Sequence, residues 1–260
     1  MKFDYSPLVL VLAQVVFTPI SAITRKRAEL QEAFRLLGYP LPKEHQEQQI
    51  QLQEAGIELN LSQMLECATI NQHRSILIDE QSLVLQESEY QRFAAFSPQL
   101  LQALQTLQET VKGDLYIRRI GLRYIDWIPP EDGFSPEQLI HPGIGVFQPE
   151  GLPESFQSVQ QFMMMTTSKS LMNLRVIRGQ FEEVLPTELI RFAPKMKRPP
   201  QPDQRSVLLD FDHILDFGED PLHFDPATLP ELLREHQKYH SQAFKGSLSS
   251  TALQKWGYQE

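Results

Sequence analysis

The sequence predicts an α+β protein with a mainly antiparallel sheet, formed by two related halves that pack as one pseudo-duplicated unit. Two observations predict this class. Strand-like apolar runs precede a long amphipathic helix twice along the chain. The six residues RSILID at 74–79 also return as RSVLLD at 205–210. A few strands followed by one helix do not bury their apolar face alone, so two such units would share a core.

Composition limits the function classes. The chain has 260 residues, enough for one large domain or two small ones, and 41% hydrophobic with 22% charged residues is typical of a globular protein. The net charge of −9 argues against a generic nucleic-acid binder, which usually carries a basic surplus. A single cysteine, Cys67, excludes an intramolecular disulfide and a cysteine-rich zinc site. We expect a cytoplasmic protein with no cofactor and no membrane association.

The first element is an apolar run over Leu8–Phe17. Its Val and Leu content and its position between Pro7 and Pro19 predict a buried β-strand. The region also has the outline of a secretory signal, with small residues after the run. Asp4 and the interruption at Gln14 argue against a signal, and the run is too short to span a bilayer.

The next stretch predicts a helix and then polar strands. Apolar residues recur at helical spacing over 28–37, and Gly38 ends the helix. The glutamine-rich residues 43–55 indicate a solvated loop or an edge strand. Further strands are expected near Ile57–Leu61 and Leu65–Asn71.

A hairpin followed by a helix is predicted in the first half. Strands are expected at Ser75–Ile78 and Leu83–Gln86, around a turn at 79–82. A helix is expected to begin near Ser97 and Pro98, a capping residue followed by proline at the first helical position. Its predicted apolar stripe is Leu100, Leu101, Leu104 and Leu107.

The same order is predicted in the second half. Strands are expected at Val207–Leu209 and Ile214–Phe217, around a turn at 210–213. A helix near Asp225 and Pro226 follows, at an offset of about half the chain from the first helix start. Coincidence is the alternative to duplication, because such short patterns are common. The predicted apolar stripe is Leu229, Leu232, Leu233 and His236.

These patterns divide the chain into three parts. Residues 1–128 form the first α+β half and residues 155–260 the second. Residues 129–154 are rich in proline and glycine, which indicates a connector with a short embedded segment.

The stretch YIRRIGLRYIDW at 116–127 is the first candidate for binding. As a strand, it places Arg119, Gly121 and Arg123 on one face, where an anion or an acidic partner could approach the backbone closely. The alternative is an edge strand whose arginines pair with the protein's own acids.

Two further stretches are candidates for contact with another protein. The methionine run after Phe162 is soft and adaptable, although such runs are more often a buried helix end. The basic, proline-rich residues 195–204 predict a surface loop that could contact phosphates or an acidic protein. The predicted partner-binding residues are Arg119, Arg123, Met163, Met164, Met165, Lys195, Lys197 and Arg198.

The acidic stretch 208–225 allows a metal-dependent alternative. Asp210 and Asp212 would point to the same side of a strand and could share a divalent cation, with His213 or His223 assisting. The stretch lacks the glycine and the terminal glutamate of a calcium loop. A hairpin with a polar outer face explains it equally well.

Other titratable residues are expected to be structural. His236 and His240 lie four apart on a helix, but no glutamate follows the first, so we expect packed histidines. Cys67 is likewise expected to be a packing residue. The sequence contains no phosphate-binding loop, no dinucleotide fingerprint, no nucleophile elbow and no HExxH motif.

The chain resembles a family of uncharacterised bacterial and archaeal proteins of about this length, distributed sporadically among genomes. The resemblance rests on the strand over 7–17, on IGLRYID at 120–126, and on LLDFD with the helix and ALQKWG that follow within 208–257. It implies no catalytic residue. Its sporadic distribution is similar to that of defence-associated genes, which implies an accessory role beside a larger complex of the CRISPR or toxin–antitoxin type.

Together these observations predict a non-enzymatic protein that binds another protein as an accessory or regulatory subunit. A metal-dependent enzyme and a nucleic-acid-binding accessory protein are the alternatives.

Overall fold

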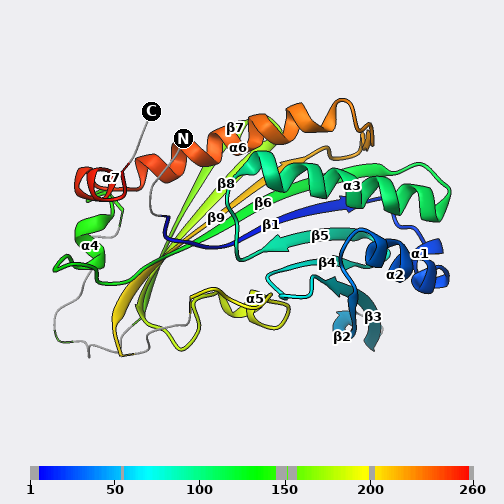
Figure 1. Cartoon of the computed structure of the whole chain (residues 1–260), viewed down its shortest axis with the longest axis horizontal. Coiled ribbons are helices and arrows are strands. Elements are labelled where there is room, and N and C mark those ends of the chain that lie inside the picture. Colours follow the sequence, from blue (N-terminus) through cyan, green and yellow to red (C-terminus); the bar gives the residue numbers. More distant parts are fainter. Residues whose placement is uncertain (1–5, 54–55, 145–150, 152–156, 199–202, 258–260) are drawn as a thin grey trace.

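The computed structural model describes most of the chain (Figure 1). Its backbone is described for residues 6–53, 56–144, 151, 157–198 and 203–257, without the side chains of 47–53 and 56–62. The strands are β1 (Leu8–Phe17), β2 (Leu41–Gln53), β3 (Gly56–Ala68), β4 (Arg74–Ile78), β5 (Ser82–Glu87), β6 (Tyr116–Ile128), β7 (Ser158–Thr167), β8 (Ser170–Gln180), β9 (Arg205–Asp216) and β10 (Leu222–His223). The helices are α1 (Ala22–Arg25), α2 (Arg27–Leu36), α3 (Phe93–Val111), α4 (Pro136–Leu139), α5 (Thr187–Ile190), α6 (Leu229–Gly246) and α7 (Ser250–Lys255).

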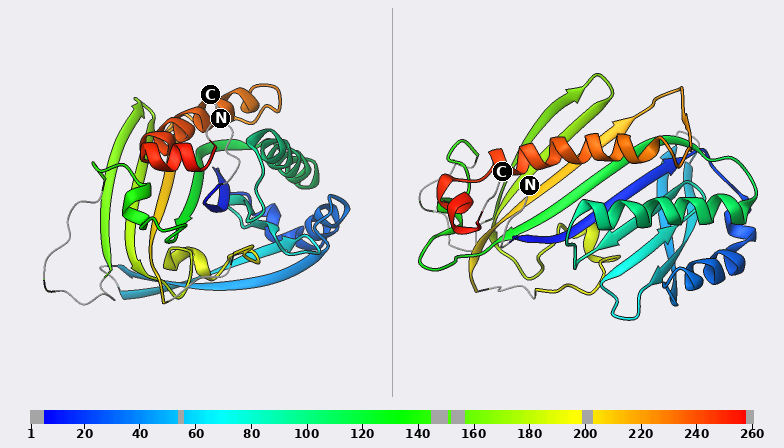
Figure 2. Two further views of the ribbon diagram at one scale, coloured as in Figure 1. Left: turned by 60° about the vertical axis from the view of Figure 1, so that its left-hand side comes forward. Right: turned by 45° about the horizontal axis from the view of Figure 1, so that its top comes forward.

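In the described part of the chain, the ten strands form one antiparallel sheet in an α+β fold. The order is β2-β3-β4-β5-β1-β6-β9-β8-β7, and β10 pairs with one end of β6. Strands β1 and β6 therefore lie at the centre, with β2 and β7 at the two edges. Helices α3 and α6 run side by side over one face of the sheet (Figure 2), which we call the covered face.

The covered face holds most of the hydrophobic core. Along β1, the residues Val11, Ala13 and Val15 alternate with partly exposed ones, and all three are fully buried. They pack with Leu100 and Leu104 of α3, whose stripe matches the prediction. The predicted strand over Leu8–Phe17 is thereby confirmed.

Elements near the N-terminus follow their sequence signals. Gly38 ends α2 with a positive φ of 96°, which favours glycine over residues with a side chain. The polar stretch 43–55 lies largely within the edge strand β2, one of the two predicted outcomes. The predicted strands over Ile57–Leu61 and Leu65–Asn71 form one strand, β3, which ends at Ala68, so residues 69–71 are not part of it. Cys67 in β3 is fully buried, as expected, and burial raises the pKa of its thiol to about 12.

The predicted hairpin of β4 and β5 is confirmed, but its counterpart in the second half is wrong. Residues 205–216 form the single strand β9, so 210–213 is not a turn. Asp210 and His213 lie in this strand and are completely buried. Their polarity suggested a turn, but contacts from other elements, described below, stabilise them within a central strand.

Both predicted helix starts are displaced. Helix α3 begins at Phe93, so Pro98 lies inside the helix and Ser97 does not cap it. Helix α6 begins at Leu229 after Thr228, three residues beyond the predicted start at Pro226. Both predicted apolar stripes nevertheless face the core.

The Pro- and Gly-rich stretch 129–154 contains the short helix α4, which the embedded segment predicted. Ser135 caps this helix, and the side chain of Gln138 returns to the backbone of Ser135. Of the helices that the structure describes, none is long and apolar enough to cross a membrane.

Candidate functional site on the open face of the sheet

The open face is the side of the sheet opposite α3 and α6. Strand β6 lies at its centre, so it is not the edge strand that the structural alternative required. Because directly opposed residues of antiparallel strands point to the same side, the register defines this face. One row of cross-strand neighbours runs from β4 to the edge strand β7 and consists of Leu77, Val84, Gln14, Gly121, Ile214, Leu171 and Met165.

The next row of cross-strand neighbours crosses the predicted arginine strand at Arg123. Arg123 of β6 opposes Leu12 of β1 on one side and Asp212 of β9 on the other. The predicted division of the strand into two faces is thereby confirmed. Arg119, Gly121 and Arg123 share the open face, and Ile120 between them is buried against the helices.

Arg123 belongs to a cluster of four charged side chains that we call the arginine clamp: Arg123, Arg175, Asp210 and Glu188. Arg123 donates from Nε to Oδ1 of Asp210 at 2.8 Å and from Nη2 to Oδ2 at 2.9 Å. Arg175 of β8 donates from Nε to Oδ2 of the same carboxylate at 2.7 Å. A buried charge is tolerated when it is paired and hydrogen-bonded, which explains a fully buried aspartate in β9.

Glu188 joins the clamp from outside the sheet. It accepts a hydrogen bond from Nη2 of Arg123 at 2.7 Å and a second one from Arg175. Burial alone would raise the pKa of Glu188, but the two arginines outweigh it and hold the pKa at about 2. Glu188 is therefore a stable anion that fastens α5 to the sheet.

Glu188 is part of a segment over residues 181–196, which we call the covering segment. Its side chains Phe181, Val184 and Leu185 pack against Ile125 and other open-face residues of the central strands. This packing forms a hydrophobic cluster on the open face, separate from the core on the covered face. The covering segment covers only part of the open face and leaves Arg119 partly exposed.

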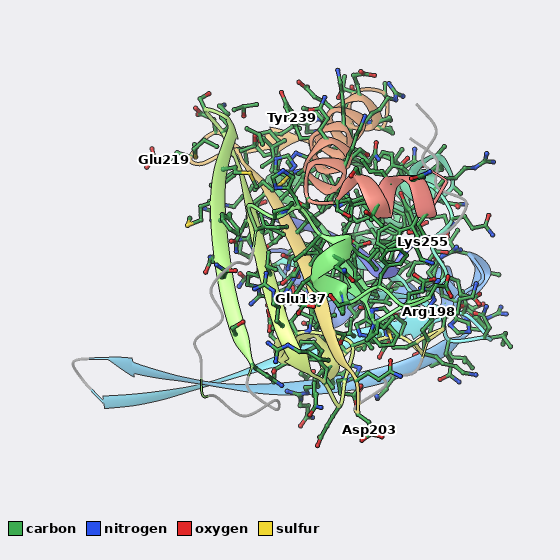
Figure 3. All side chains as sticks on the ribbon, turned by 90° about the vertical axis from the view of Figure 1, so that its left-hand side faces the viewer. Glu137, Arg198, Asp203, Glu219, Tyr239 and Lys255 are labelled. Atoms are coloured by element: carbon green, nitrogen blue, oxygen red, sulfur yellow. The ribbon has the colours of Figure 1, made fainter. Side chains whose placement is uncertain are left out.

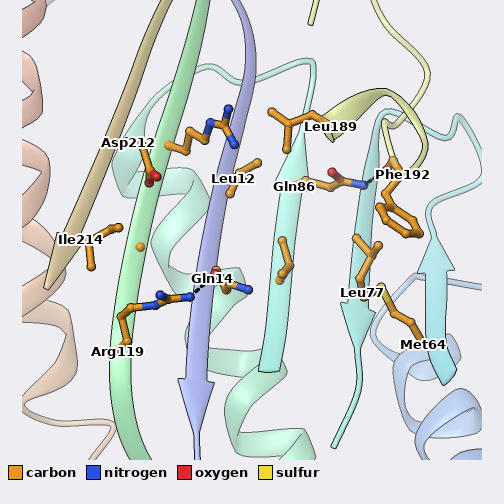
Figure 4. Close-up of a pocket in the computed structure, with 13 residues that line it drawn as sticks. Leu12, Gln14, Met64, Leu77, Gln86, Arg119, Leu189, Phe192, Asp212 and Ile214 are labelled. Carbon is orange, nitrogen blue, oxygen red and sulfur yellow. Dashed lines mark hydrogen bonds between the residues drawn. The ribbon is translucent and has the colours of Figure 1, made fainter. Parts of the chain in front are cut away.

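A pocket of about 310 Å³ remains beside the covering segment (Figure 4). Its floor is formed by strands β3, β4, β5, β1, β6 and β9, and Leu189 and Phe192 of the covering segment line one side. The volume lies at the lower end of the range of small-molecule sites. The lining side chains are mostly apolar, with Gln14, Gln86, Arg119, Arg123 and Asp212 as the polar ones.

Arg119 makes fewer hydrogen bonds than Arg123, the pocket's other arginine. Among the described residues, its guanidinium makes one hydrogen bond, from Nη2 to Oε1 of Gln14 at 3.4 Å, which is long. Asp212 lies nearby and is partly buried. Burial raises the pKa of Asp212, and the charges of Arg123 and Arg119 oppose that rise while Asp210 adds to it.

The methionine run lies at the far edge of the same face. Met163 and Met165 of β7 are 66% and 68% exposed, and Val159 on the same side of the strand is 61% exposed. The alternative interpretation of this run, a buried helix end, is therefore wrong. Met164 points to the covered side and is less exposed. Figure 3 shows β7 at the outer margin of the sheet. No helix of the described chain lies on the outer side of this strand.

The predicted basic loop, residues 195–204, begins at the C-terminal end of the covering segment. Lys195 and Lys197 are exposed, and Arg198 is partly exposed. The backbone of Lys195 is anchored: its carbonyl accepts from Oγ of Ser88 at 2.6 Å, and its N–H donates to the carbonyl of Gln72 at 2.8 Å. Part of the predicted loop, 199–202, lies outside the described residues.

The covered face holds a group of three buried histidines. His213 of β9 stacks on His236 of α6, with ring centroids 3.7 Å apart. His236 donates from Nε2 to the carbonyl of His213 at 3.0 Å, and Nε2 of His213 accepts from Oγ1 of Thr166 at 2.8 Å. His240 stacks on Tyr124 at 3.6 Å. Burial lowers the pKa of His213, His236 and His240 to about 3, 4 and 3. His236 and His240 are the packed histidines that the sequence predicted, and His213 packs with them, which the sequence did not predict.

The acidic stretch offers no free carboxylate pair. Asp210 and Asp212 share a face, as expected for a strand, but both oxygens of Asp210 are occupied by guanidinium groups. Within the described ranges, no group of three or more His, Cys, Asp and Glu side chains is arranged to hold a metal ion. His213 is buried on the opposite face, so it is not beside Asp212.

Sequence reasoning missed the second arginine of the clamp and the whole covering segment. Arg175 and Glu188 are distant in sequence from Arg123, and single polar residues in apolar surroundings carry little signal. Leu189 and Phe192 resemble ordinary core residues. Comparisons with protein-family models, with curated proteins and with solved structures found no match to the chain.

Proposed function

We propose that this protein binds another protein, and that the edge strand β7 is its docking site. One observation carries the proposal. Strand β7 is ten residues long, contains no charged residue and has Val159, Met163 and Met165 exposed along one side. An edge strand of this kind is a template for pairing with an added strand.

The opposite edge strand, β2, differs from β7 in a way that supports this proposal. Strand β2 carries Pro42, Lys43 and Glu44 at its start, residue types that discourage pairing with a foreign strand. Strand β7 carries no such protection. Methionine side chains are flexible and polarizable, which suits a surface that adapts to the side chains of a partner.

The partner that fits this edge is an extended, uncharged segment of a different protein with apolar residues at alternate positions. Pairing would satisfy the outer backbone groups of β7 and cover the apolar side chains of Val159, Met163 and Met165 on the open face. A second copy of the chain is less suitable, because each copy carries a net charge of −9. The accessory role in a defence complex, which the resemblance implies, is proposed together with this partner class.

The test compares capture of native-host proteins by matched variants. Met163→Lys combined with Met165→Lys places two charges on the edge and should lower recovery of a stoichiometric partner more than tenfold. Leu36→Lys combined with Ile70→Lys is the control, because these side chains are each 72% exposed and lie away from β7. Equal recovery by both double variants would rule out β7 as the docking site.

Strand addition is then separated from side-chain contact by hydrogen exchange. Paired amides of β7 should exchange more slowly in the purified complex, whereas contact through methionine side chains alone would leave them unprotected. Light scattering tests the alternative partner, a second copy of the chain. A dimer that dissociates in the methionine double variant would identify a second copy as the partner in place of a different protein.

We also infer that the two halves arose by duplication, and the strand order supports this. This inference moves the boundary between the halves from residue 128 to before β6. Apart from β2, β10 and the helices other than α3 and α6, the first half then consists of β1, β3, β4, β5 and α3. The second half consists of β6, β7, β8, β9 and α6, in mirrored order around the centre of the sheet. In this correspondence RSILID in β4 and RSVLLD in β9 are not equivalent, so their likeness is coincidental. Failure of the two halves to superpose on one another would contradict the inference.

A further inference from the structure

The pocket on the open face has the construction of a small-molecule site. Hydrogen bonds on both sides of the pocket-lining residues hold the covering segment over it. At one end Glu188 is bound by both arginines of the clamp. At the other end Nε2 of Gln86 donates to the carbonyl of Phe192. Leu189 and Phe192 are thereby fixed as one wall of the pocket, in agreement with the preference of ligands for preformed sites.

The pocket is polar at one end and apolar at the other. Figure 4 shows Arg119 and Gln14 on the β6 and β1 side, and Leu77 and Met64 on the β4 and β3 side. Four strand spacings separate β6 from β3, or about 19 Å at ~4.8 Å per spacing. A ligand that follows the pocket is therefore elongated, with a polar head beside Arg119 and an apolar body across β5 and β4.

The polar end favours a single negative charge on the ligand. A guanidinium presents several donors, and Arg119 uses one of them in a long hydrogen bond. Arg123 is already committed to Asp210 and Glu188. Among the described residues Arg119 makes a single long hydrogen bond, and it lies close to Asp212. Its guanidinium therefore suits a singly charged carboxylate, which it binds through two parallel hydrogen bonds, better than a doubly charged phosphate ester.

The floor of the pocket is open because residue 121 is glycine. A Cβ atom built on Gly121 would meet nothing closer than Cβ of Gln14, at 4.0 Å. The position lies in a central strand with ordinary extended pairing to Gln14 and Ile214. Neither steric crowding nor backbone conformation requires glycine there, whereas a side chain would enter the space that a ligand needs.

We propose that this pocket binds an amphipathic monocarboxylate, with its carboxylate on Arg119 and its aliphatic chain along Val84, Leu77 and Met64. The ligand class is that of medium-chain fatty acids and similar carboxylates. This site is separate from β7, so the proposal stands independently of the protein-binding function.

The experiment measures binding of decanoate to the purified full chain by calorimetry, with decanoate methyl ester and decyl phosphate as analogues. We expect saturable binding of decanoate that is at least tenfold tighter than that of either analogue, because a charge-assisted hydrogen bond contributes about 1.5–3 kcal/mol. Equal affinity for the methyl ester would overturn the carboxylate assignment, and tighter binding of decyl phosphate would do the same. Absence of saturable binding would overturn the site.

Two variants locate the binding. Arg119→Gln should weaken decanoate binding at least tenfold and leave binding of the methyl ester unchanged. Gly121→Val should abolish binding of all three compounds without lowering the melting temperature, because valine suits a strand interior better than glycine. Arg118→Gln is the matched control, since Arg118 is the exposed neighbour in the same strand on the opposite face. Decanoate binding that survives Gly121→Val would place the ligand outside this pocket.

Discussion

The two faces of the sheet stabilise buried polar residues in opposite ways. On the covered face, the histidines of β9 and α6 are neutral: burial lowers the pKa of each to 3 or 4, and the rings stack on one another or on tyrosine. On the open face, Asp210 is charged and is paired with two arginines. Strand β9 contributes to both, with His213 on one side and Asp210 on the other.

This difference between the faces indicates where ligand and partner sites are expected. A face sealed by helices excludes water, so its titratable groups lose their charge. The open face retains charged groups, and its ion pairs also position the covering segment. Ligand and partner sites are therefore expected on the open face, and the covered face is expected to determine stability.

The largest expected effect comes from breaking the arginine clamp. Arg123→Met leaves Asp210 with one arginine and removes a donor to Glu188. Removing one partner from a buried ion pair costs about 3–5 kcal/mol, so we expect a loss of about 3 kcal/mol in the free energy of unfolding. Denaturant titration measures it.

Arg234→Met is the control for the clamp. Arg234 pairs with Glu231 one helical turn away on the exposed side of α6, and such pairs contribute about 0.3–0.5 kcal/mol. Similar losses in Arg123→Met and Arg234→Met would show that the clamp is no stronger than a surface pair.

The next effect is a loss of stability in acid that arises from the covered face. The folded-state pKa values of the three histidines lie below the ordinary value of 6.5, so the unfolded chain binds more protons below pH 6.5. The histidines therefore do not lower stability above pH 6.5, and below it they destabilise the fold progressively toward pH 3–4, by up to about 1.4 kcal/mol per pH unit for each histidine.

His240→Phe tests this pH dependence. Phenylalanine retains the stacking on Tyr124, and Nε2 of His240 has no hydrogen-bond partner among the described atoms. We expect unchanged stability at pH 7.5 and about 2 kcal/mol less destabilisation between pH 6.5 and 4.5. Thermal unfolding across this range measures it, with exposed His223→Phe as the control. An unchanged acid profile in His240→Phe would contradict the assignment of this histidine.

A smaller effect is expected from releasing the covering segment. Glu188→Gln removes the charge that both arginines bind, and half of the Glu188 side chain is exposed. We expect a loss of about 0.5–1 kcal/mol in global stability. Faster amide hydrogen exchange over residues 187–196 should accompany it, without a change in β4. Unchanged exchange in the covering segment would mean that its apolar packing alone holds it.

The smallest effect is expected at the edge of the open face. Met163→Lys should change the free energy of unfolding by less than about 0.5 kcal/mol, because the side chain is exposed and makes few contacts. A loss above about 1 kcal/mol would instead indicate that the methionines stabilise the isolated fold, and would weaken their assignment to partner binding.

Strands and helices with a clear apolar pattern could be predicted from the sequence. The strand over Leu8–Phe17 follows from its continuous run of Val and Leu between two prolines. The two faces of the strand over 116–127 follow from alternation, because one side of that strand is buried by helices. The apolar stripes of α3 and α6 follow from helical spacing in the same way, even though the helix starts do not.

The failures share a physical cause. Asp210 and His213 resembled a turn because buried polar residues are uncommon in strands. The groups that stabilise them, Arg123, Arg175 and Thr166, are distant in sequence. The pocket depends on the covering segment in the same manner, since Leu189 and Phe192 define a site only after the chain folds back over the sheet.

The buried thiol of β3 makes the molecule suitable for chemical labelling. Because the pKa of Cys67 is about 12, only about one part in 10⁵ is thiolate at neutral pH, and the side chain is inaccessible to reagents. Cys67 is also the chain's one cysteine. A cysteine introduced at Met163 or beside the pocket would therefore react alone with a spin label or a fluorophore, and would report partner and ligand binding separately.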